Sequence, residues 1–169
     1  MDLEGGCACG RIRYRLTAPP LIVHACHCRD CQKQTGSAFV LNIWIEKNRV
    51  EADHSSPKSV MLTAGSGKPH EVFYCGDCGT RLWSKYHAAP GDTLLLRVGT
   101  LDHPEMVEPD VHIFTRSKLP WFELPPGAVA FEAFYKMPEV WPAASQERLR
   151  RNIAGESNGP ATAGTSAGI

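Results

Sequence analysis

The chain has 169 residues, a formal net charge of zero and a sequence pI of about 7.0, with 43% hydrophobic and 21% charged residues. This length predicts one domain that can bury a hydrophobic core without disulfide bonds. Because basic and acidic residues both number 18, the charge balance argues against nucleic acid or an anionic membrane as a partner. The unusual feature is a set of seven cysteines.

The first residues, MDLEGG, lack the basic stretch and apolar run of a secretory signal, and no apolar segment reaches membrane-spanning length. We therefore expect a cytoplasmic protein. Thiols stay reduced in the cytoplasm, where clustered cysteines more often bind metal or react than form disulfides.

Alternation of apolar and polar residues dominates the chain and predicts β-strands. Residues 11–16, RIRYRL, place three arginines on one face, as in an antiparallel strand with one side in solvent. Those arginines indicate either a solvated face or a small anion site. A more deeply buried strand is predicted at residues 39–45. Shorter runs separated by turn residues predict strands at residues 59–63, 71–74, 81–85, 93–98 and 111–115.

Helical signal is confined to two short segments. Residues 30–35 predict one or two turns that end at Gly36, and residues 145–151 predict a helix with Ser145 as its N-cap. Most prolines lie beyond residue 100, which predicts loops and edge strands there.

The resulting organisation is mainly β. We expect a zinc-binding domain over residues 1–143, a short helix over 144–151 and a disordered tail over 152–169, where the chain is rich in Gly, Ala, Ser and Thr.

Four of the cysteines have the spacing of a structural zinc site. Cys75 and Cys78 form a C-x-x-C followed by Gly79, which lets the backbone fold around a metal. Cys7 and Cys9, a C-x-C pair beside glycines at a strand end, are the natural source of two further ligands. Together they predict a tetrahedral site of four thiolates that joins the N-terminal hairpin to the middle of the chain.

The other three cysteines, Cys26, Cys28 and Cys31, fall within six residues, so one short loop can present all of them to one metal. Three protein ligands with an open fourth position is the arrangement of a catalytic zinc.

Alternatives remain at this stage. The cysteines could form disulfides, a multinuclear cluster or an iron–sulfur centre, although the usual ferredoxin spacings are missing. The triplet could instead be a second structural zinc closed by His24 or His27. The remaining histidines show no mutual ligand spacing and are assigned structural roles: His54, His70, His87, His103 and His112.

The ordered series GGCACGRIRYRL, HACHCRDCQKQTGSAF, FYCGDCGTRLW, LRVGTLD and HIFTRSKLPWF resembles the glutathione-dependent formaldehyde-activating enzyme family, which includes centromere protein V. The resemblance implies an Mss4-like fold of several antiparallel sheets with two zinc sites. It places the structural zinc on the C-x-C and C-x-x-C pairs and the second zinc, where glutathione binds, on the triplet.

The activity that the resemblance implies is formation of S-hydroxymethylglutathione from glutathione and formaldehyde, classed as a carbon–sulfur lyase for the reverse direction. The substrates would be a small thiol and an aldehyde. Four residues after the triplet could line the open metal position or simply form a helix end and its cap: Gln34, Thr35, Gly36 and Ser37.

A non-catalytic reading competes with this one. The chain could be a zinc-stabilised module that binds a protein partner through the proline-rich, aromatic segment 119–142, unless those aromatic side chains cover the core. The neutral charge argues against binding to chromatin.

Overall fold

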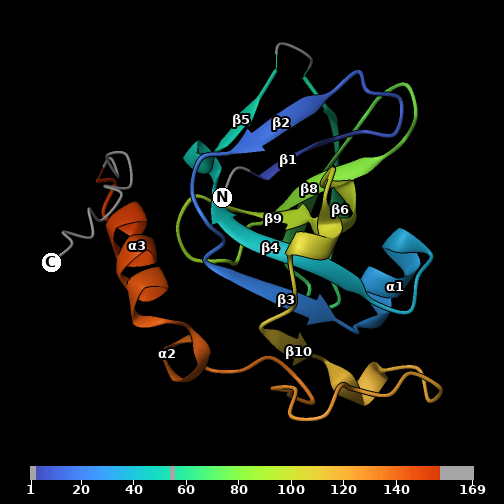
Figure 1. Cartoon of the computed structure of the whole chain (residues 1–169), viewed down its shortest axis with the longest axis vertical. Coiled ribbons are helices and arrows are strands. Elements are labelled where there is room, and N and C mark those ends of the chain that lie inside the picture. The colour runs from blue at the N-terminus through green and yellow to red at the C-terminus, as the bar shows by residue number, and fades with distance from the viewer. Residues whose placement is uncertain (1–2, 54–55, 157–169) are drawn as a thin grey trace, which may run out of the picture.

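The computed structural model describes residues 3–53 and 56–156. Within these residues the strands form two sheets (Figure 1). The smaller is antiparallel, in the order β1 (Leu3–Gly6), β2 (Arg13–Leu16) and β5 (Val50–Ala52). The larger follows the order β10–β3–β4–β9–β8–β7–β6, and only its β10–β3 pair is parallel. Its strands are β3 (Ile22–Cys26), β4 (Val40–Glu46), β6 (Lys58–Thr63), β7 (Pro69–Tyr74), β8 (Arg81–Tyr86), β9 (Thr93–Arg97) and β10 (Val111–Ile113).

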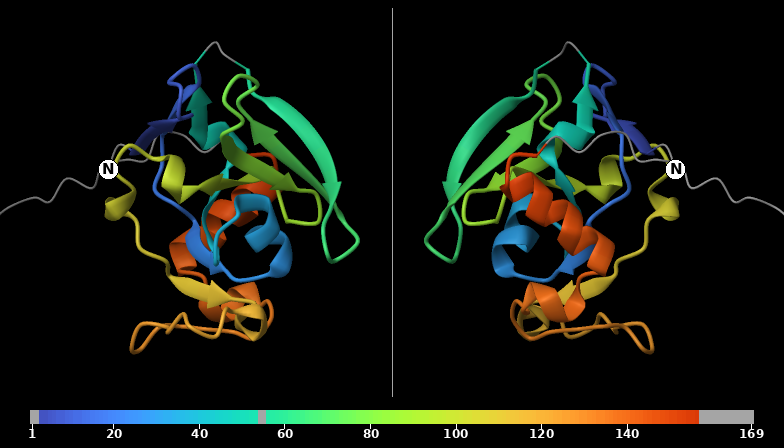
Figure 2. Two further views of the ribbon diagram at one scale, coloured as in Figure 1. Left: turned by 90° about the vertical axis from the view of Figure 1, so that its right-hand side faces the viewer. Right: turned by 90° about the vertical axis from the view of Figure 1, so that its left-hand side faces the viewer.

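Helices are short and lie outside the sheets. The α-helices are α1 (Arg29–Thr35), α2 (Met137–Val140) and α3 (Ala143–Ile153). The two views of Figure 2 place α1 and α3 on opposite sides of the molecule. Single 3-10 turns occur at η1 (Lys47–Arg49), η2 (Val98–Thr100), η3 (Pro104–Met106) and η4 (Thr115–Ser117).

The main core lies between the two sheets. Leu3, Tyr14 and Leu16 of the small sheet pack against the apolar side chains of β4, β8 and β9, such as Ile43 and Leu96, which are fully buried. Alternation in β2 puts Tyr14 and Leu16 inside and Arg15 outside, as the period of a strand requires. This packing determines where the β1–β2 loop of the small sheet meets the β7–β8 loop of the large sheet.

A second core covers the outer face of β3, β4 and β10. Trp141 and Leu149 of the C-terminal segment pack there against Trp44 and Ile22. Tyr135 belongs to the same cluster, and its hydroxyl accepts a hydrogen bond from Trp141 Nε1 at 2.8 Å. Much of the aromatic segment 119–142 therefore completes the core.

The mainly-β class with a few short helices is confirmed, and each predicted strand is present with ends within two residues of the prediction. Beyond residue 100 the described chain adds only β10, an edge strand, as the prolines indicate. Three strands were not predicted. β1 and β5 are short, and β3 is buried on both faces, so its sequence IVHAC is apolar without alternation.

The helix predictions are partly corrected. Helix α1 ends at Gly36, which caps it with a left-handed φ of 67°. Helix α3 begins at Ala143 with Pro142 in the N-cap position, so Ser145 is not the cap but lies buried inside the helix. The helix also continues to Ile153, into the predicted tail, and residues 157–169 of that tail lie outside the described part of the chain. The domain boundary at residue 143 stays a prediction.

No helix among the described residues is both long and apolar enough to cross a lipid bilayer.

We expect the contact of α3 with β4 to be a main source of stability for the C-terminal segment. Arg148 donates to both carboxylate oxygens of Glu46, at 3.0 and 2.6 Å, and Glu46 is fully buried. Arg148→Met should lower the free energy of unfolding by about 3 kcal/mol, because the carboxylate loses its partner. Denaturant titration measures the change.

The matched control is Arg150→Met on the same helix, because Arg150 pairs with Glu147 in solvent. Its cost should stay below about 1 kcal/mol. Equal losses in the two variants would contradict a special role for the buried pair.

Candidate metal centres

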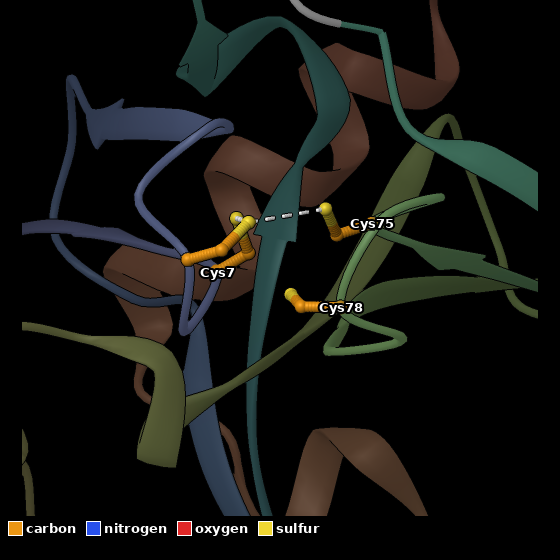
Figure 3. A group of neighbouring side chains, drawn as sticks. Cys7, Cys75 and Cys78 are labelled. Carbon is orange, nitrogen blue, oxygen red and sulfur yellow. Dashed lines mark hydrogen bonds between the residues drawn. The ribbon is translucent and has the colours of Figure 1, made fainter.

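The first cysteine cluster lies where the hairpin tips of the two sheets meet. Cys7 and Cys9 occupy the β1–β2 loop, and Cys75 and Cys78 occupy the β7–β8 loop. Their four sulfur atoms lie within 4.8 Å of one another. The Sγ–Sγ distances are 3.4 Å for Cys7–Cys9 and 3.8 Å for Cys9–Cys75. Figure 3 shows Cys7 facing Cys75 and Cys78 across the gap between the loops.

Both loops reach this position through the same kind of turn. In one, Gly10 N–H donates to the Cys7 carbonyl at 2.9 Å, and in the other, Gly79 N–H donates to the Cys75 carbonyl at 2.9 Å. Gly10 and Gly79 have φ angles of 75° and 74°, which favour glycine because a Cβ atom would strain the backbone. The turns direct both pairs of sulfur atoms into one volume.

Polar contacts around this cluster stabilise ionised sulfur. Ile12 N–H donates to Cys7 Sγ at 3.2 Å. The Thr80 hydroxyl lies 3.2 Å from Cys78 Sγ and lowers the pKa of Cys78 to about 6. Thr80 also accepts from Ala8 N–H at 3.1 Å, and Arg11 forms an ion pair with Asp77, so the two loops are linked independently of any ion.

The geometry of the four sulfurs fits a tetrahedral ion. With metal–sulfur bonds of about 2.3 Å, the sulfurs of a tetrahedral zinc lie about 3.8 Å apart. The observed separations bracket that value, and an all-thiol donor set suits zinc or another soft ion. The cluster can therefore hold a metal.

The second cluster lies at the junction of β3 and α1. Cys26 ends β3, Cys28 is the N-cap of α1 and Cys31 lies in its first turn, with the three sulfurs within 4.8 Å of one another. Cys28 Sγ accepts a hydrogen bond from Cys31 N–H at 3.4 Å, which caps the helix. The N-terminus of α1 thus holds the triplet in one place.

The three thiols of this cluster affect one another's pKa through hydrogen bonds. Hydrogen bonds from the Cys26 and Cys31 thiols lower the pKa of Cys28 to about 2, and the hydrogen bond with Cys28 raises the pKa of Cys26. One thiol ionises readily, whereas three adjacent thiolates repel one another. A divalent cation removes this repulsion, so the donor set fits a metal ion.

Neither histidine considered as a fourth ligand joins the triplet. Among the described residues, the group of side chains here that could hold a metal ion contains only Cys26, Cys28 and Cys31. His24 Nε2 lies 2.6 Å from the Tyr135 hydroxyl, and His27 Nε2 lies 3.1 Å from His112 Nδ1. Desolvation by burial lowers the pKa of His24 to about 4, so this ring is neutral at pH 7. In the described residues the triplet is a three-ligand group.

A cavity of about 530 Å³ is lined in part by residues of α1 and β4 that neighbour the triplet, although none of the three cysteines is on its wall. Thr35, on its wall, donates to the Cys31 carbonyl at 2.8 Å, and Val40 is the strand partner of Cys26. The volume falls within the roughly 300–1,000 Å³ of small-molecule sites. The lining residues are Gln34, Thr35, Phe39, Val40, Leu41, Gly79, Arg81, Arg97, Gly99 and Thr100.

The four residues predicted to follow the triplet divide into two pairs. Gln34 and Thr35 line the cavity, whereas Gly36 is the helix cap and Ser37 is exposed outside the lining. The sequence patterns alone do not identify Arg81 or Arg97. The only signal was an arginine that ends the apolar run TLLLR, a position where a buried charge is unusual.

Several other arginines and histidines that were considered as site residues pair with nearby carboxylates. Arg13 and Arg15 form surface ion pairs with Asp102 and Glu51, which favours the interpretation of this strand face as a solvated one. His87 and His103 each face a glutamate, and His54 lies outside the described residues. In the aromatic segment, Trp121 and Phe134 remain exposed, at 69% and 43%, while Tyr135 and Trp141 are buried.

Two comparisons of the sequence with known proteins point to the same family. The profile of the family described as glutathione-dependent formaldehyde-activating enzyme matches residues 2–117, which include all seven cysteines. A protein of Halomonas elongata, provisionally named a glutathione-dependent formaldehyde-activating enzyme, is 31% identical over 88 residues. That match spans about half of each chain, 49% of this one and 55% of the relative.

A crystal structure of a Rhodobacter sphaeroides protein has a TM-score of 0.48 and 14% identity, and the match covers 63% of this chain and 96% of the other.

The contact of His24 with Tyr135 gives a test of the three-ligand group. Tyr135→Phe should lower the free energy of unfolding by about 1–3 kcal/mol, because His24 and Trp141 each lose a buried hydrogen-bond partner. The metal content per chain, measured by elemental analysis, should not change. Loss of one metal ion in this variant would show that the tyrosine–histidine pair supports a metal site, and would contradict a triplet formed by cysteines alone.

Proposed function

The chain belongs to the family of glutathione-dependent formaldehyde-activating enzymes, and we propose that it joins a thiol such as glutathione to formaldehyde or a similar small carbonyl compound. The observation that carries this proposal is the triplet of Cys26, Cys28 and Cys31, a three-thiol metal-binding group beside a cavity of small-molecule size. A site with three protein ligands leaves a coordination position for a substrate.

The two cysteine clusters would have different tasks. We assign zinc to both, because an all-sulfur donor set favours it. Cys7, Cys9, Cys75 and Cys78 supply four ligands and close their site. This site joins the two sheets where the main core ends, since Cys7 and Cys75 belong to that core. Cys26, Cys28 and Cys31 supply only three, so we place the reaction there.

The reaction needs a thiolate and a carbonyl carbon close together. The S–C bond forms as the carbonyl π bond breaks, and the thiol proton ends on the oxygen, which gives an S-hydroxymethyl product; cleavage in the reverse direction is a carbon–sulfur lyase reaction. Zinc bound at the triplet would lower the pKa of the incoming thiol so that it attacks as a thiolate.

This chain's own residues would mainly hold the substrate in place. The three cysteine thiolates give the site negative charge, which reduces its power to polarise a carbonyl. The side chains of Phe39, Val40 and Leu41 would give the substrate an apolar surface on one wall of the cavity. We therefore expect positioning of the thiol to contribute more to the rate than activation of the carbonyl.

Thiol binding at the triplet can be followed directly. Protein loaded with Co²⁺ should change its sulfur-to-cobalt absorption bands when glutathione is added, because a fourth sulfur enters the coordination sphere. S-methylglutathione, which has no free thiol, is the matched control and should leave the bands unchanged. Identical spectra with and without glutathione would overturn the proposal.

Single cysteine variants separate the two sites. Cys78→Ser should lose one metal ion and several kcal/mol of stability, because metal binding at a structural site is folding free energy. Cys28→Ser should stay folded, since serine also caps a helix, as Cys28 does for α1. It should instead lose at least tenfold in the exchange rate between glutathione and formaldehyde, measured by NMR.

The relative stability of the two variants decides the assignment. If Cys28→Ser melted at as low a temperature as Cys78→Ser, both clusters would be structural.

A further inference from the structure

Strand β6 forms the outer edge of the large sheet. It pairs with β7 on one side, and among the described residues no strand lies on its other side (Figure 2). Its middle is apolar, since Val60 is 39% exposed and Met61 is 55% exposed. Exposed edge strands are usually protected from pairing by charged residues, proline or a bulge. β6 has one charged residue, Lys58 at its start, and its register with β7 is continuous, so its middle lacks that protection.

The backbone of β6 presents an ordered set of hydrogen-bonding groups to solvent. Just beyond the strand, Ala64 N–H donates to the Lys68 carbonyl at 2.9 Å, which continues the ladder between β6 and β7. Hydrogen bonding alternates along an antiparallel strand. The N–H and C=O groups that point away from β7 are therefore those of Ser59, Met61 and Thr63.

The two faces of β6 also differ. Val60 lies opposite Val72 on β7, and this row of side chains continues across the sheet to Leu95 on β9. Leu95 packs against the second core, which also contacts Cys31 of α1. Because side chains alternate along a strand, every second residue of β6 points to the face on which α1 lies. These residues are Lys58, Val60 and Leu62.

Two charges without an ion-pair partner lie on this face, one near each end of β6. Lys58 begins the strand. Asp30 of α1 lies beyond the other end, where its Oδ2 accepts a hydrogen bond from Gly65 N–H in the β6–β7 turn at 2.6 Å. Within the described part of the chain, neither Lys58 nor Asp30 forms an ion pair. A strand that runs antiparallel to β6 would bring two such opposite ends together.

A second copy of the chain matches the outward groups of β6. Two copies related by a two-fold axis run antiparallel, and residues opposite each other must point to the same face. The register centred on Met61 pairs Met61 with its own copy and Ser59 with Thr63. It uses the outward backbone groups of all three residues, and it places Val60 beside Leu62 of the other copy.

The same register brings the unpaired charges together. It places Lys58 of one copy opposite Ala64 of the other, the residue before Gly65. Lys58 is exposed, so its side chain can turn across the edge and reach Asp30 of the second copy. A register centred on Val60 would instead set Lys58 opposite Leu62. Charge complementarity therefore favours the register centred on Met61.

We infer that β6 is the interface of a symmetric dimer, in which the large sheets of two copies join into one continuous sheet. The interface is small, so the dimer should be weak, with a Kd in the micromolar range. The inference does not depend on the proposed function. Because Asp30 lies between Cys28 and Cys31, each copy would contact the start of the other's α1.

Association is measured by sedimentation velocity over a series of protein concentrations. The weight-average mass of the wild type should rise from one chain toward two. Met61→Lys should weaken association at least tenfold, because two like charges then face each other across the two-fold axis. Met106→Lys is the matched control, since Met106 is 49% exposed in η3, and it should associate like the wild type.

The charge pair is tested by a double-mutant cycle. Lys58→Gln and Asp30→Asn should each weaken association about three- to tenfold, because each change removes both copies of the pair. The double variant should associate no more weakly than either single variant. Elemental analysis should show the same metal content in Asp30→Asn as in the wild type. Losses that simply add would show that the two charges do not meet and would overturn the register.

Hydrogen exchange identifies the strand involved. Backbone amides of β6 should exchange more slowly at high protein concentration than at low concentration, whereas those of β5, an edge of the small sheet, should exchange equally at both. A wild type that stays monomeric at every concentration would overturn the inference. Protection of β6 in such a monomer would show that another part of the same chain covers the edge. A dimer that persists unchanged in Met61→Lys would place the interface elsewhere.

Discussion

The balance of charge among closely spaced thiols is the constraint on which the rest of the structure depends. Seven sulfur atoms occupy two small volumes, and thiolates at distances below 4.8 Å repel one another unless a cation lies between them. A divalent ion bound in either cluster would resolve the repulsion. The four-sulfur cluster uses hairpin tips from both sheets, and the triplet uses one strand end and one helix start.

The two cysteine clusters differ in their positions in the fold and in their surroundings. The four-sulfur cluster lies where the main core ends, and Cys75 is 1% exposed there, so an ion at that place would join parts of the chain that are almost 70 residues apart. The triplet neighbours residues that line a cavity, such as Thr35 and Val40, and Cys28 and Cys31 are partly exposed. We therefore propose that the same donor atoms serve stability in one place and substrate binding in the other.

Sequence reasoning identified the parts of this arrangement that depend on spacing. Local geometric rules govern the C-x-C and C-x-x-C pairs, the triplet and the glycine after Thr35. The cysteines lie together in the two groups that their spacing predicts, and the glycine caps α1. The strand β3 was missed because burial on both faces removes alternation. Arg97 was missed because its role depends on Asn42, Cys31 and Arg81, which three other segments bring together. Such long-range contacts leave no periodic signal in the sequence.

The net charge of zero does not describe how charge is distributed within the protein. Arginines on the surface pair with carboxylates, as Arg13 does with Asp102, and so contribute little field at a distance. The two arginines of the cavity wall have other partners: buried Arg97 lies near the thiols of Cys31 and Cys26, and partly exposed Arg81 donates to a backbone carbonyl. Because addition of a thiol to formaldehyde needs little activation, an enzyme for it gains most by choosing and holding the right thiol. The cavity near the triplet can contribute to that choice through its shape and through the local charges of Arg97 and the thiols, which the net charge of the whole chain does not describe.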